Sequence, residues 1–334
     1  MFFVICTGCA STWSPTLESS VEPRRWLDSD NSIRVSYFAS VKGFKETGTS
    51  VSNMLKYAVF GRSKENVIER PVAIAVGQGD RFAIADLGCS CVHLYVPDRQ
   101  LYRKIYAAGK DELSTPVSVA FDDASRLYVS DSSKGAIYAF DPEGTFLFSI
   151  KKAGAANIMR PTGLAYSTRK KILYAVDTPA NRVHAFSSNG ETLFSFGGRG
   201  EKNGQLNLPT HIVTDKDGRL YVTDAMNFRI QVFDAEGNFV SGFGHHGNGS
   251  GDLAMPKGIA VDNSGVVYVV DALFDNVQLF SLTGGFLFTI GGRGTGEGEF
   301  WLPSGLFLDT AKKLYVCDTY NNRVQIFQLT GNTP

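Results

Sequence analysis

The sequence predicts an all-β protein: a six-bladed β-propeller built from four-stranded antiparallel blades. Composition is the first observation, because 35 Gly, 24 Phe and 13 Tyr among 334 residues indicate many turns and many aromatic-rich strands. The second is an internal repeat, opened each time by a proline before an apolar stretch, at intervals of 45 to 48 residues. These prolines are Pro71, Pro116, Pro161, Pro209, Pro256 and Pro303. Residues 71–334 are therefore predicted to form six blades that start at these positions.

Each repeat carries the same four predicted strands. The first reads Pro-x-x-apolar-x-apolar, as in 256–261, and leads to an Asp/Gly turn such as 215–218. A second strand of the form Leu-Tyr-Val-x-Asp follows (220–224), and then a third that ends in Phe (229–233). A turn ending in Gly leads to a fourth strand, such as 286–290. Strands this short and this rich in Val, Tyr and Phe exclude helical repeats of similar period.

The recurring Pro-x-Gly, Leu-Tyr-Val-x-Asp and Asn-Arg-Val motifs resemble the NHL repeat of bacterial propellers over residues 71–329. The best copies are the third, fourth and sixth, with Asp177, Asn181 and Arg182; Asp224, Asn227 and Arg229; and Asp318, Asn322 and Arg323. In the first two copies Cys91 and Ala136 occupy the Arg position, and Ala73 and Ser118 occupy the Gly position. Because Asp and Arg recur together, we predict that they form an architectural ion pair.

The sixth repeat ends after its third strand, residues 324–328, so its outer strand has to come from elsewhere in the chain. We expect that strand within residues 31–70, a closing strand with further elaboration. Residues 32–39 have strand composition and are predicted to close the ring. Residues 55–60 end in the Phe that precedes Gly in other fourth strands, and they are the alternative. The apolar spacing across 51–60 also fits a short helix.

Residues 1–30 are predicted to be a signal remnant followed by a tether. Small residues before Cys9, after an apolar stretch, resemble the lipobox of bacterial lipoproteins, in which this cysteine carries the lipid. The apolar stretch is only about five residues long, no Lys or Arg precedes it, and Cys6 replaces the usual Leu. A plain terminus is therefore the alternative. If Cys9 is lipidated, we expect a lipid-anchored protein on the periplasmic side of a bacterial cell envelope.

Charge and cysteine content argue against several classes of protein. Lys plus Arg (33) equals Asp plus Glu (33), so we expect no nucleic-acid partner, and membrane contact only through an N-terminal lipid. The five cysteines are too few and too scattered for a disulfide framework, and Cys89-Ser90-Cys91 lacks the CxxC spacing of zinc and redox sites. Nucleophile-elbow and HExxH motifs are absent. We predict no cofactor and no metal.

Binding residues are predicted on the face that carries the loops after the second strands and the long Gly-rich connectors between repeats. In an up-and-down blade these two sets of loops lie together. The candidates for contact with a ligand or partner are His211, Arg160, Arg199, Arg293, Lys257 and Trp301. They imply a non-catalytic binding or scaffold propeller whose partner is a protein, a peptide or a glycan.

His211 supports an alternative function. It occupies the position held by Gly in three sister repeats, at the start of an innermost strand, and is expected at the mouth of the central channel. The alternative is therefore a propeller lyase or hydrolase that acts at this mouth. Similar propeller lyases bind zinc through histidines from several blades, whereas this ring of positions offers one, too few for a catalytic zinc site.

Overall fold

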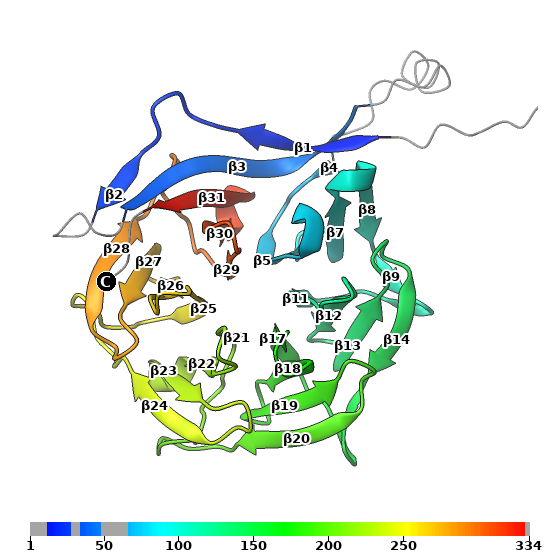
Figure 1. Cartoon of the computed structure of the whole chain (residues 1–334), viewed down its shortest axis with the longest axis vertical. Coiled ribbons are helices and arrows are strands. Elements are labelled where there is room, and N and C mark those ends of the chain that lie inside the picture. Colours follow the sequence, from blue (N-terminus) through cyan, green and yellow to red (C-terminus); the bar gives the residue numbers. More distant parts are fainter. Residues whose placement is uncertain (1–11, 28–33, 48–65, 331–334) are drawn as a thin grey trace, which may run out of the picture.

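The structure, a computed structural model, describes residues 12–27, 34–47 and 66–330. Six β-sheets are arranged as blades around a central channel (Figure 1). Five sheets contain four antiparallel strands that follow one another along the chain, with the first strand innermost. The predicted all-β propeller is confirmed. Among the described residues, no helix has the length and apolar character that crossing a membrane requires.

The first three blades follow directly in sequence. Blade 1 consists of β5 (Pro71–Val76), β6 (Phe82–Asp86), β7 (Cys91–Val96) and β8 (Leu101–Ile105), with 3-10 turns η1 (Gln78–Asp80) and η2 (Pro97–Arg99). Blade 2 consists of β11 (Pro116–Phe121), β12 (Leu127–Asp131), β13 (Ala136–Phe140) and β14 (Phe146–Ile150). Blade 3 consists of β17 (Pro161–Ser167), β18 (Ile172–Asp177), β19 (Arg182–Ser187) and β20 (Thr192–Gly197). Small hairpins join these blades: β9 (Ala107–Ala108) with β10 (Asp111–Glu112), and β15 (Lys152–Ala153) with β16 (Ala156–Asn157).

The remaining blades show the same order with shorter inner strands in two of them. Blade 4 consists of β21 (Ile212–Thr214), β22 (Leu220–Asp224), η3 (Ala225–Asn227), β23 (Arg229–Phe233) and β24 (Phe239–Phe243). Blade 5 consists of β25 (Pro256–Val261), β26 (Val267–Asp271), β27 (Asn276–Phe280) and β28 (Phe286–Gly291). Blade 6 contains β29 (Leu306–Leu308), β30 (Lys313–Asp318), η4 (Thr319–Asn321) and β31 (Arg323–Thr330).

Blade 6 takes its outer strand from the other end of the chain. Strand β3 (Arg34–Glu46) pairs antiparallel with β31, from Arg34 opposite Thr330 to Val41 opposite Val324. The predicted closure by residues 32–39 is confirmed for residues 34–39, and the pairing continues two residues further. The alternative closing strand and helix at 51–60 lie outside the described residues.

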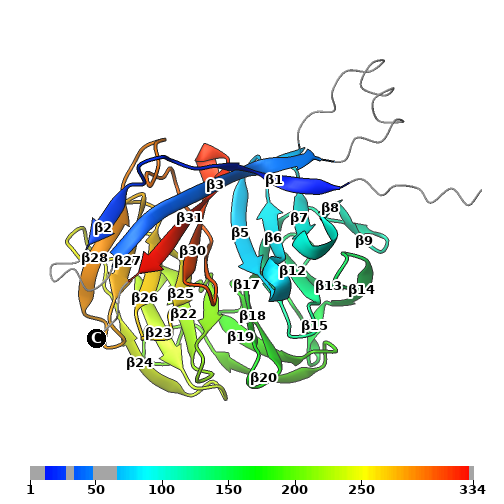
Figure 2. The ribbon, with the colours of Figure 1, turned by 45° about the horizontal axis from the view of Figure 1, so that its top comes forward.

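The expected tether is partly wrong, because part of residues 1–30 is strand. Strands β1 (Trp13–Glu18) and β2 (Arg25–Leu27) pair with β3 along the outer edge of blade 6 (Figure 2). Strand β4 (Asn66–Val67) also pairs with β3. Aromatic packing explains why these segments form strands: the ring of Trp13 lies 5.1 Å from that of Tyr102, and the ring of Trp26 lies 5.6 Å from that of Phe327. Ser, Pro and charged residues between the two tryptophans obscured this signal in the sequence.

The core is divided into six hydrophobic clusters, and each lies where two neighbouring blades meet. The recurring motif supplies them: the Tyr of the second strand is fully buried in blades 2 to 5. Its hydroxyl donates to the turn aspartate in blades 2, 4 and 5, as Tyr221 does to Asp215, whereas Tyr174 of blade 3 donates to the Ala235 carbonyl. The Phe that ends the third strand is fully buried in blades 2 to 6. Burying this apolar area between blades holds the ring together.

Candidate functional site

Each second strand ends in an aspartate that is almost completely buried, and its carboxylate accepts hydrogen bonds from the backbone of the connector that precedes the blade. The donating N–H groups, at 2.6–3.1 Å, belong to Glu69 and Arg70 (to Asp86), Ser114 and Thr115 (Asp131), Met159 and Arg160 (Asp177), Asn207 (Asp224), Ala254 and Met255 (Asp271), and Trp301 (Asp318). These bonds tie the connectors to the loops after the second strands. Both sets of loops therefore form one surface, called here the loop face.

The predicted Asp–Arg ion pair exists in two of the three best repeats. Arg229 Nε donates to Asp224 and Arg323 Nε to Asp318, both at 2.8 Å. The prediction is wrong for blade 3, because Arg182 is exposed to solvent. In that blade His184 Nε2 lies 3.7 Å from the Asp177 carboxylate instead.

The long Gly-rich connectors before blades 4, 5 and 6 share one folded arrangement. Each folds over a completely buried side chain, Leu206, Leu253 or Phe300. A single parallel bridge opposite that residue holds Arg199, His246 or Arg293 in place. The two arginines are exposed, and neither hydrogen-bonds to a described residue, so their guanidinium groups are available to a ligand from a fixed backbone.

Trp301 and Arg160 also lie on the loop face. The indole of Trp301 is 41 % exposed and its ring centre lies 5.7 Å from that of Tyr320, which is 48 % exposed. Arg160 lies in the connector before blade 3, across the ring from blade 6 (Figure 1); it is exposed, and its guanidinium has no partner among the described residues. Lys257 is half-buried, and burial lowers the pKa of its ammonium group.

The loop face also carries exposed apolar side chains, of which the sequence analysis had identified only Trp301. They lie just before the blade prolines or two residues after the buried aspartates, and only in blades 3 to 6: Met159, Leu208, Met226, Met255, Leu273, Trp301 and Tyr320. We call these seven residues the apolar arc. Blades 1 and 2 have Glu69, Arg70, Gly88, Ser114, Thr115 and Ser133 at the same positions. Aligning these positions across the repeats would have found the arc.

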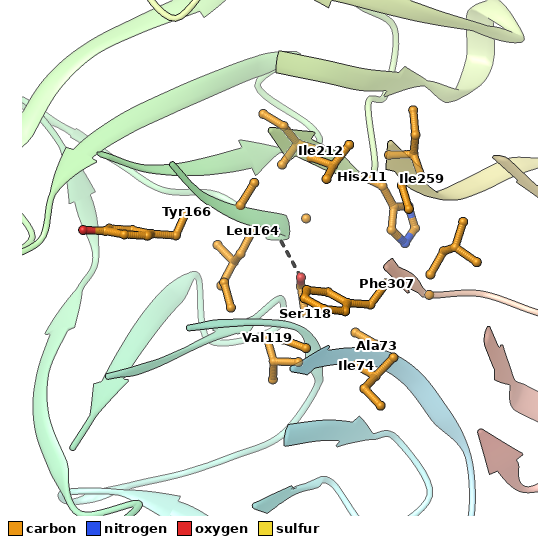
Figure 3. Close-up of a pocket in the computed structure, with 18 of the residues that line it drawn as sticks. Ala73, Ile74, Ser118, Val119, Leu164, Tyr166, His211, Ile212, Ile259 and Phe307 are labelled. Atoms are coloured by element: carbon orange, nitrogen blue, oxygen red, sulfur yellow. Dashed lines mark hydrogen bonds between the residues drawn. The ribbon is translucent and has the colours of Figure 1, made fainter. Parts of the chain in front are cut away.

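The central channel contains a pocket of about 350 Å³, lined by the inner strands of all six blades (Figure 3). Its wall is mostly apolar, with Ile74, Val119 and Phe307 among the lining residues. Ser118 Oγ accepts a hydrogen bond from the Leu164 N–H at 3.1 Å. Among the described residues that line it, none is a carboxylate.

His211 is the one histidine that lines this pocket, and its imidazole points into it in Figure 3. Its Nδ1 lies 3.0 Å from the Thr210 hydroxyl. Burial, together with the nearby charge of Lys257, lowers the pKa of His211 to about 3, so the imidazole is neutral at pH 7. Close packing explains why blade 3 has a glycine at the corresponding position: a Cβ on Gly163 would lie 2.7 Å from the Cα of His211. A neutral imidazole can bind a ligand or accept a proton.

Blade 1 holds the group of described residues that could bind a metal. Cys89, Cys91 and His93 place their ligand atoms within 4.8 Å of one another. The two cysteines form a disulfide, although the cysteine content predicted no disulfide framework. The backbone turn explains the bond: Ser90 adopts a positive φ of 49°, which brings the flanking Cα atoms to 5.2 Å. Cys317 is a buried free thiol, and burial raises its pKa.

Comparison with known proteins gives the same architecture. A family model described as a 6-bladed beta-propeller matches residues 209–285 and 264–334, less than half of the chain. None of the curated proteins matches. Similar solved structures include a virginiamycin B lyase from Staphylococcus aureus, 13 % identical over 78 % of this chain and 95 % of its own, with a TM-score of 0.58.

Two further similar structures belong to proteins of other functions. A gluconolactonase from Xanthomonas campestris is 13 % identical over 96 % of this chain and 99 % of its own, with a TM-score of 0.62. An auxiliary nutrient binding protein from Bacteroides ovatus is 15 % identical over 79 % of this chain and 70 % of its own, with a TM-score of 0.59. At such low identity these likenesses show the fold alone, which here is the six-bladed β-propeller.

Proposed function

We propose that this chain is a non-catalytic propeller that binds a polypeptide partner on its loop face. The apolar arc carries the proposal. Exposed apolar side chains that gather on one face of a protein mark an interaction site. Here they follow the ring over blades 3 to 6, while the same positions in blades 1 and 2 are polar or Gly.

The composition of this surface supports a protein or peptide over a glycan. Trp, Tyr, Met and Arg are the residues enriched at protein interfaces, and the loop face presents Trp301 and Tyr320 beside three methionines. Methionine side chains adapt to varied apolar partners. The exposed guanidinium groups of Arg160, Arg199 and Arg293 favour a partner segment that also carries acidic residues.

The alternative, an enzyme acting at the channel mouth, is supported by His211 in its pocket. Two of the structurally similar proteins, a lyase and a gluconolactonase, are enzymes, which is consistent with such a role. A pocket wall without a described carboxylate argues against it, because hydrolysis at such a site needs a second group to hold a metal or to activate water. His211 and Lys257 are better suited to contact a ligand that reaches the channel.

Two finer assignments belong to the same proposal. The repeats are NHL-like, on the strength of the motif copies in blades 3, 4 and 6. The protein is anchored in a bacterial cell envelope through a lipid on Cys9, which rests on the lipobox-like sequence before that residue. A cysteine-to-serine change at this position should release the protein from the membrane, and release is measured by detergent partitioning.

The test uses peptides selected from a random library on the intact propeller. Their affinity is then measured by calorimetry for the Trp301→Ala/Tyr320→Ala double variant. We expect at least a tenfold loss, because exposed aromatic anchors dominate interface energies. The control is Leu147→Ala/Leu193→Ala, which removes two similarly exposed apolar side chains from outer strands and should change nothing. An equal loss of peptide affinity in both double variants would overturn the proposal. Failure to select any peptide, together with binding to glycans on an array, would overturn it as well.

A further inference from the structure

Three side chains surround the buried aspartate in blades 4 and 6, and they are of the same kinds in both. In blade 4 the Oδ2 of Asp224 accepts hydrogen bonds from Asn227 Nδ2 at 2.9 Å, Arg229 Nε at 2.8 Å and Gln231 Nε2 at 2.9 Å. In blade 6 the corresponding donors to Asp318 are Asn321, Arg323 and Gln325, at 2.9, 2.8 and 2.9 Å. This neutral–cationic–neutral set of donors has no capacity to bind a metal.

In blade 1 all three positions are exchanged together. Cys91 pairs with Asp86 across the two strands as Arg229 pairs with Asp224, so Cys91 stands at the Arg position. Cys89 and His93, two residues to either side, stand at the Asn and Gln positions. Three hydrogen-bond donors have thus become two thiols and an imidazole, which are the preferred ligands of zinc. The carboxylate at the centre is retained.

Distances within this group already approach those of a metal site. His93 Nε2 lies 3.7 Å from Cys91 Sγ, 3.9 Å from Cys89 Sγ and 3.1 Å from Asp86 Oδ2. Zinc bonds of about 2.3 Å to sulfur and 2.0–2.1 Å to nitrogen at tetrahedral angles place those ligand atoms about 3.6 Å apart. Only the two sulfur atoms, joined in the disulfide, are closer than a shared ion permits.

We propose that Cys89, Cys91 and His93 bind one zinc ion when the two cysteines are reduced, and that their disulfide excludes the ion. Opening the disulfide takes two electrons and two protons from a reductant and yields two thiols. Zinc then displaces the two thiol protons and takes the Nε2 lone pair. A water molecule takes the fourth position, because Asp86 Oδ2 already accepts the Glu69 N–H at 2.7 Å.

The surroundings of His93 suit this role. Its Nδ1 lies 2.8 Å from the Tyr102 hydroxyl, which can accept a hydrogen bond from Nδ1–H when Nε2 holds a metal and can donate one to Nδ1 when it does not. Phe44 from β3 stacks on the imidazole with ring centres 5.6 Å apart and fixes its plane. Cys91, His93 and Asp86 are fully buried, whereas Cys89 is partly exposed and opens the site to the loop face.

The experiment titrates Co²⁺, as a coloured substitute for zinc, into full-length protein carrying Cys6→Ser and Cys9→Ser. The protein is reduced with a phosphine, which becomes the phosphine oxide as the two thiols form and does not compete strongly for the metal. We expect one Co²⁺ per chain, thiolate-to-cobalt absorption in the near ultraviolet, and displacement by one equivalent of Zn²⁺. The same protein left oxidised should bind at least a hundredfold more weakly.

Variants separate the site from adventitious binding. His93→Gln should weaken binding at least tenfold, while His184→Gln, which changes the equivalent histidine of blade 3, should leave it unchanged. The triple variant Cys89→Asn/Cys91→Arg/His93→Gln restores the residues of blades 4 and 6, so it should fold and bind no metal. Equal binding by the oxidised protein, or by the triple variant, would overturn the proposal. Absence of stoichiometric Co²⁺ from the reduced protein would overturn it as well.

Discussion

Blades 1 and 6 are neighbours in the ring, yet they surround the same buried carboxylate with opposite chemistry. In blade 6, Asp318 is hydrogen-bonded to the guanidinium of Arg323 at 2.8 Å, and both side chains are buried. In blade 1, Asp86 faces Cys91 and the imidazole of His93, whose pKa is lowered by burial. The difference shows that the fixed role of the aspartate is to accept backbone N–H groups, and that the side chains around it are free to change.

Strand β3 is shared by both blades. It pairs with β31 of blade 6 through Val41, and further along Phe44 stacks on Tyr102 of blade 1 with ring centres 4.2 Å apart. The segment that closes the ring therefore also covers the junction at which the two blades differ. Removing β3 is therefore expected to have the largest effect on the protein.

A chain that begins at Lys42 should fail to fold or should aggregate. It lacks the residues that pair with β31, so blade 6 presents an open edge, and edges of this kind associate with other chains. A chain that begins at Asn31 keeps β3 and should fold, although with a lower melting temperature because Trp13 and Trp26 are lost. Light scattering and thermal melts distinguish the two. Identical melting of both chains would show that β3 is not the closing strand.

Replacing the aspartate itself should affect blade 6 more than blade 1. Asp318→Ala leaves the buried guanidinium of Arg323 without its carboxylate, and removing one partner of a buried pair costs about 3–5 kcal/mol. Asp86→Ala leaves neutral groups and backbone N–H donors unpaired, at a cost of about 1–3 kcal/mol. Chemical unfolding of the oxidised protein measures both. Equal losses would mean that the side chains around the carboxylate do not matter.

The arginine position sharpens the comparison further. Arg323→Ala should cost about 3 kcal/mol, because Asp318 remains buried without its cationic partner. Arg182→Ala, at the same motif position in blade 3, should stay within about 0.5 kcal/mol, since its side chain is exposed. Unfolding titrations of the two variants provide the check. A large loss at Arg182 would contradict the arrangement seen in blade 3.

Much of the fold follows from the sequence, because a six-fold repeat with fixed prolines and strand motifs leaves few alternative topologies. Closure by β3 followed from the missing outer strand. Strands β1 and β2 could not be predicted, since their order depends on Trp13 and Trp26 packing against residues far along the chain. The motif was also misaligned in blade 6: Asn321 donates to Asp318, whereas Asn322 has a positive φ of 56°.

The candidate sites were predictable only in part. His211 was identifiable because it breaks the Gly pattern, and Trp301 because it stands in a connector. The apolar arc was missed because its residues are single positions scattered over four repeats, which only the ring brings together. Cys89 and Cys91 were judged by spacing alone, and nothing in the sequence pattern indicates that His93 completes the group.

Blade 3 offers the test with the smallest expected effect, because acid protonates the buried carboxylate of Asp177 without removing any side chain. Burial alone would raise the pKa of Asp177, but the nearby imidazole of His184 and hydrogen bonds from the backbone N–H groups of Met159 and Arg160 lower it below the usual 3.8. A carboxylate with a lowered folded-state pKa stabilises the protein fully above the unfolded value and less as pH falls through the folded one. Unfolding free energy should therefore decline below about pH 4. Asp177→Asn should decline less steeply over that range, and parallel curves for the two proteins would show that this carboxylate is not held in its charged form.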